Sequence, residues 1–214
     1  MRVRAVIFDL WETLIDWNRE SADAMISRIA ELTDPGFADR WSTSRSRYTG
    51  SIRAALAEAG VPPAAMEEVC AIRRASIGAD LVPRPGAVET LRELRARGFL
   101  VGLITVCSED VEHLWEASEF AGLFDAEVFS SAVGLSKPDP RIYLHCCELL
   151  GARPGECVFV GDGANDELAG ALRVGMPAIL IHRPGEPPLW PGLDAWKGPR
   201  VTSIPDVLEV VELC

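Results

Sequence analysis

The sequence lacks the features that would place the protein in a membrane or on a nucleic acid. No apolar run approaches the about 20 residues that a helix needs to cross a bilayer. Basic residues are scarce, because 21 lysines and arginines stand against 32 aspartates and glutamates, which gives a formal net charge of −11. Negative charge repels phosphate backbones and anionic lipid headgroups. We therefore expect no nucleic-acid partner and no membrane partner.

The cysteines and histidines do not have the spacing of the common zinc sites. Six cysteines and three histidines are present, but there is no Cys-x-x-Cys pair and no zinc-like Cys/His pattern. A chain of 214 residues also buries enough surface to fold without disulfides. The cysteines are therefore expected to be reduced and buried, as in a protein of the cytoplasm.

Short apolar runs alternate with stretches of helical periodicity along most of the chain. The runs have the length of strands covered on both faces, as in a parallel sheet. They lie at residues 4–8, 100–105, 126–129, 157–160 and 178–181. Helical spacing follows at residues 86–97, 110–121, 139–150 and 167–174. This alternation predicts an α/β fold, with a doubly wound, Rossmann-like parallel sheet.

One segment interrupts the alternation of strands and helices. Residues 16–81 contain helical windows, such as 20–32 and 49–59, and no run that has the length and composition of a strand. Pro83 and Pro85 follow this segment and stiffen the return to the sheet. The sequence thus predicts a core of residues 1–15 and 82–214, with a helical cap of residues 16–81 inserted after the first strand.

Polar residues follow the predicted strands at the edge where open α/β sheets bind ligands. Asp9 follows the first strand, Thr105 ends the second, and Asp162 begins an acidic loop after the fourth. Two carboxylates in one crevice repel each other unless a divalent cation lies between them, and hard oxygen ligands suit magnesium. An anionic group could then bridge the cation and Lys137, where Asp9 could attack it.

Each of these residues alone has an ordinary structural explanation. Asp9 could cap a helix, Thr105 could cap a loop, and Lys137 before a proline could simply be solvated. The glycines around Asp162 are too few for a dinucleotide-binding loop. The combination of all four residues, in this order and at these strand ends, favours a common site.

Four stretches of the chain resemble the motifs of the haloacid dehalogenase superfamily, whose hydrolases use an aspartate nucleophile. They are Val6-Ile7-Phe8-Asp9-Leu10-Trp11-Glu12-Thr13-Leu14, Leu103-Ile104-Thr105, Lys137-Pro138-Asp139, and Val160-Gly161-Asp162 continuing to Ala171. The predicted helical insertion is similar to the small cap that closes over the crevice in that family. The resemblance extends over nearly the whole chain.

The resemblance implies catalytic and substrate-binding roles. Asp9 would be the nucleophile, Thr105 would hydrogen-bond the transferred group, and Lys137 would orient Asp9 and offset negative charge. A small anionic substrate is expected, bound by a monomer or a homodimer. The residues expected to surround the substrate are Trp11, Thr13, Val106 and the cap residue Arg45, and Thr13 would also brace the loop.

The resemblance also implies Mg²⁺ as cofactor. Its ligands would be Asp9, Asp162, the backbone carbonyl of Trp11 and a second acid from the loop after the fourth strand. Family members space that second acid differently, so Asp166 and Glu167 both fit, and Asp166 is favoured.

The first motif departs from the family's phosphatases at one position. Those enzymes carry a second aspartate two residues after the nucleophile, which protonates the leaving alcohol, whereas this chain has Trp11. An indole can donate a hydrogen bond but cannot shuttle a proton. Loss of a general acid costs about 10²–10⁴-fold in rate when the leaving group is poor. Glu12, in place of the family's usual glycine, is a second departure and a weak candidate for the missing acid.

Three functions are compatible with this departure. The first is a phosphatase-type hydrolase of a small metabolite, whose leaving group needs no proton from Trp11 or receives one from elsewhere. The second is a 2-haloacid dehalogenase, because halide leaves as an anion and that branch of the family carries an aromatic residue here. The third is a non-catalytic descendant that binds phosphate or metal. Val106 and Asp162 differ from the dehalogenase pattern, so phosphate chemistry is favoured.

Overall fold

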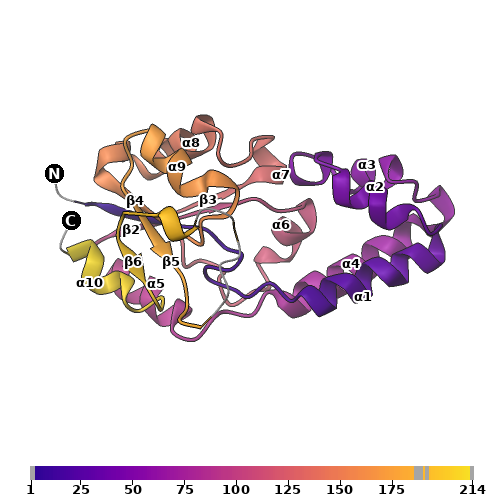
Figure 1. Cartoon of the computed structure of the whole chain (residues 1–214), viewed down its shortest axis with the longest axis horizontal. Coiled ribbons are helices and arrows are strands. Elements are labelled where there is room, and N and C mark those ends of the chain that lie inside the picture. Colours follow the sequence, from indigo (N-terminus) through magenta and orange to yellow (C-terminus); the bar gives the residue numbers. More distant parts are fainter. Residues whose placement is uncertain (1–2, 186–189, 191–192, 213–214) are drawn as a thin grey trace.

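The computed structural model describes residues 3–185, 190 and 193–212. Its centre is a six-stranded sheet in the order β3-β2-β1-β4-β5-β6, in which every neighbouring pair is parallel (Figure 1). The strands are β1 (Ala5–Phe8), β2 (Leu100–Thr105), β3 (Ala126–Phe129), β4 (Cys157–Gly161), β5 (Ala178–Ile181) and β6 (Arg200–Val201). The α/β fold class predicted from the sequence is confirmed. Strand β6 was not predicted, because it is only two residues long and one of them is exposed.

Helices cover both faces of the sheet (Figure 1). Strand β1 shows why, since its four residues are fully buried and alternate between two apolar clusters. Val6 and Phe8 belong to the cluster that includes side chains of α5 (Ala87–Ala96), α6 (Glu109–Trp115) and α10 (Val207–Glu212). Ala5 and Ile7 belong to the cluster that includes side chains of α8 (Pro140–Leu150) and α9 (Glu167–Arg173).

The chain between β1 and α5 forms a separate group of helices, which stands beyond the carboxyl ends of the strands (Figure 1). These helices are α1 (Arg19–Leu32), α2 (Phe37–Thr43), α3 (Ile52–Glu58) and α4 (Met66–Asp80). They share an apolar cluster of their own, in which the rings of Phe37 and Trp41 stack at 5.9 Å. We call this group the cap. None of the helices in the described ranges is long and apolar enough to span a bilayer.

Two neighbouring chain segments connect the cap to the sheet. Ile15 forms an antiparallel bridge with Pro83, and the backbone N–H of Arg84 donates to the carbonyl of Leu14 at 2.8 Å. Short 3₁₀ turns lie elsewhere in the described chain: η1 (Ser46–Tyr48), η2 (Pro63–Ala65), η3 (Pro154–Glu156), η4 (Ala164–Asp166) and η5 (Leu193–Ala195). The remaining helix, α7 (Ser130–Val133), follows β3 directly.

The helix predicted at residues 110–121 is shorter than the sequence pattern indicates. Helix α6 ends at Trp115, where the hydroxyl of Ser118 donates to the Trp115 carbonyl at 2.7 Å. Such a local side-chain bond offers the backbone an alternative to a further helical turn. The chain then folds back, so that the ring of Phe120 stacks on Trp115 at 5.4 Å.

Candidate active site

Asp9 and Lys137 form a buried ion pair at the carboxyl end of β1. The backbone N–H of Asp9 still donates to Val160 of the neighbouring strand, so the nucleophile candidate is held by the sheet. The Lys137 ammonium contacts Oδ1 of Asp9 and lies 2.6 Å from Oε2 of Glu167. Burial works against the charge on Lys137, but the two carboxylates outweigh burial and raise its pKa. Lys137 is therefore charged.

Two glycines allow Glu167 to enter this region from the start of α9. A Cβ atom on Gly161 would lie 2.1 Å from Oε1 of Glu167, so no other residue fits there beside the carboxylate. Gly163 has a φ of +90°, and its N–H donates to the same oxygen at 3.0 Å. Asp162, between the two glycines, accepts the N–H of Ala164 on Oδ1 at 3.0 Å.

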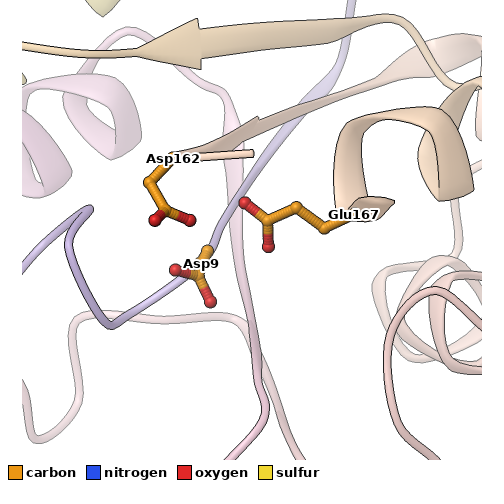
Figure 2. Close-up of side chains that lie close together, drawn as sticks. All are labelled: Asp9, Asp162 and Glu167. Atoms are coloured by element: carbon orange, nitrogen blue, oxygen red, sulfur yellow. The ribbon is translucent and has the colours of Figure 1, made fainter. Parts of the chain in front are cut away.

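The carboxylates of Asp9, Asp162 and Glu167 face one another (Figure 2). One oxygen from each lies within 4.8 Å of the other two, and all three residues are buried. We call these three residues the acidic cluster. Hard divalent cations bind oxygen at about 2.0–2.6 Å, so their ligands lie up to about 5 Å apart. The acidic cluster has the donor atoms and the spacing of a divalent cation site.

The second acid favoured from the sequence, Asp166, lies outside the acidic cluster and is exposed. Asn165 and Asp166 both have positive φ angles, +51° and +57°, which turn the chain sharply before α9 begins at Glu167. This turn directs Asp166 to solvent and Glu167 to the sheet. The structure thus places Glu167, the other residue that the family spacing allows, beside Asp162.

The acidic cluster carries more negative charge than its surroundings balance. Lys137 pairs with Asp9 and with Glu167, and within the described ranges no other cation is paired with the acidic cluster. When all three acids ionise, two negative charges therefore exceed the charge of Lys137. Burial raises the pKa of Asp9 and of Glu167, and the charge of Asp162 raises both further, against the opposing effect of Lys137. A divalent cation would remove this imbalance.

The hydroxyl of Thr105 lies at the carboxyl end of β2, the strand that pairs with β1. Thr105 is fully buried, and its Oγ1 has no hydrogen-bond partner within the described part of the chain. A buried hydroxyl without a partner costs about 1–3 kcal/mol. An oxygen of a bound anionic group would satisfy it. The buried Oγ1 of Thr13 lacks a partner among the described residues as well.

Trp11 and Glu12 occupy the positions where the first motif is unusual. The half-buried ring of Trp11 packs edge-on against Trp17, with centroids 5.4 Å apart. Glu12 lies 2.7 Å from the guanidinium of buried Arg84 and accepts the backbone N–H of Trp17. Arg84 also pairs with Asp16 at 2.7 Å. The Glu12 carboxylate is thus engaged by the connection between cap and sheet and is poorly placed to replace the missing acid.

Arg45, expected to contact the substrate, is exposed on the cap. It lines a surface hollow together with Arg40 and Glu58, and all of the lining residues lie between positions 40 and 59. No residue of the acidic cluster lines this hollow. Val106 is half-buried directly after Thr105.

A second group of charges joins the cap to the core. Arg73 of α4 pairs with Asp110 of α6 at 2.7 Å and donates to the hydroxyl of Ser108 at 3.1 Å. The guanidinium lies 4.5 Å from the ring centroid of Trp41, and the carboxylate of Glu109 accepts the N–H of Ile52 at the start of α3. This group could not be predicted from the sequence, because no spacing in the sequence links α4 to α6.

Trp190 is a further residue at this site that was not predicted, and it donates its indole N–H to Oδ2 of Asp162 at 2.7 Å. Trp190 follows β5 and is 36% exposed. Nothing in the sequence around Trp190 indicates a contact with the acidic cluster.

Comparison with known proteins supports a hydrolase. The chain is 26% identical over 200 residues to glyceraldehyde 3-phosphate phosphatase of Methanopyrus kandleri. This alignment covers 85% of this chain and 84% of the relative. The chain is also 34% identical over 110 residues to (S)-2-haloacid dehalogenase 4A of Burkholderia cepacia. That alignment covers 51% of this chain and 47% of the relative. A solved HAD phosphatase from Thermococcus onnurineus has a similar fold, with a TM-score of 0.74, 21% identity and 98% of both chains covered.

The family model for haloacid dehalogenase-like hydrolases matches residues 3–175. This range contains the acidic cluster, Thr105, Lys137 and the whole cap. Because the match covers most of the chain and all four motif stretches, the protein belongs to the haloacid dehalogenase-like hydrolases.

Proposed function

We propose that the protein is a magnesium-dependent hydrolase of a small phosphorylated metabolite, with Asp9 as the nucleophile. The acidic cluster around Lys137 supports this proposal most strongly, because its buried charges lack balance without a cation. A phosphate group would add further negative charge, which the cation and Lys137 together would offset. Magnesium, when bound, would also polarise the oxygens of the phosphoryl group.

Asp9, Asp162 and Glu167 would hold the cation. Lys137 contacts Oδ1 of Asp9, which leaves Oδ2 as the attacking oxygen. Oδ2 forms a bond to phosphorus while the bond to the leaving oxygen breaks, and the leaving oxygen takes the electron pair. Thr105 would donate a hydrogen bond from its hydroxyl to an oxygen of the phosphoryl group. Water then attacks phosphorus, so that inorganic phosphate leaves and the Asp9 carboxylate is restored.

The leaving group of this reaction must depart without a proton from the first motif. Trp11 cannot supply one, and Glu12 is bound to Arg84. The preferred substrates are therefore phosphates whose leaving group is stable as an anion, such as acyl phosphates and aryl phosphates. Alkyl phosphates should react about 10²–10⁴-fold more slowly, which is the usual contribution of a general acid.

Haloacid dehalogenation is the second candidate function. The aromatic Trp11 and the similarity to (S)-2-haloacid dehalogenase 4A favour it. The pair of buried acids Asp162 and Glu167 argues against it, because a halide displacement by Asp9 needs no cation site.

A turnover screen separates these functions. The purified protein is incubated with phosphate esters of graded leaving-group pKa and with short 2-haloacids, each with Mg²⁺ and with EDTA. We expect phosphate release that requires Mg²⁺ and increases as the leaving-group pKa falls. Halide release that persists in EDTA would instead establish a dehalogenase, and binding of Mg²⁺ and phosphate without turnover would establish a non-catalytic descendant.

A further inference from the structure

The residues after β5 contribute two polar contacts near the active site. The guanidinium of Arg183 contacts Asp16 at the base of the cap, and the indole N–H of Trp190 donates to Oδ2 of Asp162 at 2.7 Å. Trp190 lies outside residues 3–175, which the family model matches. Its contact with the acidic cluster is therefore an addition to the family motifs.

Each oxygen of Asp162 and of Glu167 accepts a hydrogen bond. The donors are the Ala164 N–H and Trp190 for Asp162, and the Gly163 N–H and Lys137 for Glu167. A carboxylate oxygen has two lone pairs, so an oxygen with one hydrogen bond can still bind a cation. These bonds fix the orientation of both carboxylates and leave ligand positions open.

The chemistry of an indole suits this place. Its N–H only donates, so it cannot compete for the cation as a ligand. It also carries no charge, so it does not repel a cation as another lysine or arginine would. Trp190 can therefore hold Asp162 in one orientation without adding positive charge beside Lys137.

We propose that Trp190 is a positioning residue for the cation site, where its indole N–H holds Asp162 in the orientation that binds a divalent ion. This inference rests on the proposed function, because it requires the acidic cluster to bind a cation. Outer-shell hydrogen bonds to metal ligands typically change metal affinity by about 10–100-fold.

The first test compares Trp190→Phe with a matched control, Trp196→Phe. Trp196 belongs to the same part of the chain, and its N–H donates to the carbonyl of Pro199 at 3.0 Å. Mn²⁺, which replaces Mg²⁺ and is visible by electron paramagnetic resonance, is titrated into each protein. We expect Trp190→Phe to weaken Mn²⁺ binding about 10–100-fold. Trp196→Phe should bind Mn²⁺ as the wild type does.

The second test uses the wild-type protein, so it does not depend on the folding of a variant. In a ¹⁵N-labelled sample, the assigned indole N–H resonance of Trp190 should shift when Mg²⁺ is added, because its acceptor becomes a metal ligand. The indole resonance of Trp196 should stay in place.

The outcomes separate this inference from the proposed function. Mn²⁺ binding that Trp190→Phe leaves unchanged, or an unshifted Trp190 resonance, would overturn the inference alone. Tighter binding by Trp190→Phe would also overturn it, because Trp190 would then block the site. A wild-type protein that binds no Mn²⁺ would overturn both proposals.

Discussion

Two buried groups of charges in this protein differ in their balance. In the acidic cluster, Lys137 pairs with Asp9 and Glu167, and no further cation of the described chain pairs with these two carboxylates or with Asp162. Between cap and core, Arg73 and Asp110 pair one to one, and Ser108 and the face of Trp41 complete the surroundings of the guanidinium. Both groups are buried, and both join parts of the chain that are far apart in the sequence.

The difference in net charge between the two groups indicates different roles in stability and in binding. A buried pair that is neutral as a whole needs no ligand, and removing one partner leaves an uncompensated charge. A buried excess of negative charge instead lowers the free energy of unfolding when no cation is bound, and a bound cation removes this loss. We therefore expect loss of one partner of the Arg73–Asp110 pair to lower the free energy of unfolding. For the acidic cluster, we propose that the unbalanced charge lowers stability until a cation binds.

The nucleophile gives the largest expected effect. Asp9→Asn replaces the attacking carboxylate by a neutral amide and should lower turnover on the order of 10⁴-fold or more. The free energy of unfolding without Mg²⁺ should not fall, because one of three mutually repelling carboxylates is gone. Rates for phosphate release and urea denaturation curves measure the two quantities. Retained turnover in Asp9→Asn would exclude the proposed mechanism.

The balanced pair should respond in the opposite way. Arg73→Met leaves the buried Asp110 carboxylate without its counter-charge, although the hydroxyl of Ser108 still donates to it at 3.2 Å. This change should lower the free energy of unfolding by about 3–5 kcal/mol. The double variant Arg73→Met/Asp110→Leu should recover most of this loss, since no charge then remains buried. Equal stability of the single variant and the wild type in denaturation experiments would show that the pair is not structural.

Substitutions at two neighbouring positions can test whether Glu167 or Asp166 is the second acid of the cation site. Glu167→Gln removes a charge from the acidic cluster and should weaken Mn²⁺ binding about 10–100-fold, an effect at least as large as that of losing an outer-shell contact. Asp166→Asn changes an exposed acid and should leave Mn²⁺ affinity within about twofold, since surface charges have small effects. The reverse result would restore Asp166 as the second acid.

Metal binding should give the smallest effect, a rise in thermal stability. At ten times its dissociation constant, Mg²⁺ should stabilise the folded state by about 1.4 kcal/mol. For a protein of this size, that corresponds to a rise in Tm of about 3–6 °C. Asp162→Asn should abolish the rise, whereas Asp110→Asn should lower the Tm and retain the rise. Scanning calorimetry with Mg²⁺ and with EDTA measures both.

Much of the fold could be predicted from the sequence because the central strands are covered on both faces. Their apolar runs, such as residues 157–160, are too continuous for a half-exposed strand and too short for most helices. The position of Asp9 follows from the same logic, since the residue after a parallel strand lies at the ligand-binding edge. Both features can be predicted without knowledge of a contact between distant residues.

The partners of buried polar groups could not be predicted in this way. Trp190 reaches Asp162, and Arg73 reaches Asp110, only because packing brings their elements together. The family spacing admits both Asp166 and Glu167, and the two positive φ angles before α9 decide between them.

The sequence by itself therefore determined the central strands, the helical character of the segment after β1 and the place of Asp9 at a strand end, because burial patterns and strand ends are local properties of the chain. Only the tertiary structure decided which acid joins Asp9 and Asp162, which donor holds Asp162 and how the cap is fixed. Those choices depend on the directions of side chains from separate elements, and burial enforces them because an unpaired charge or donor is costly there.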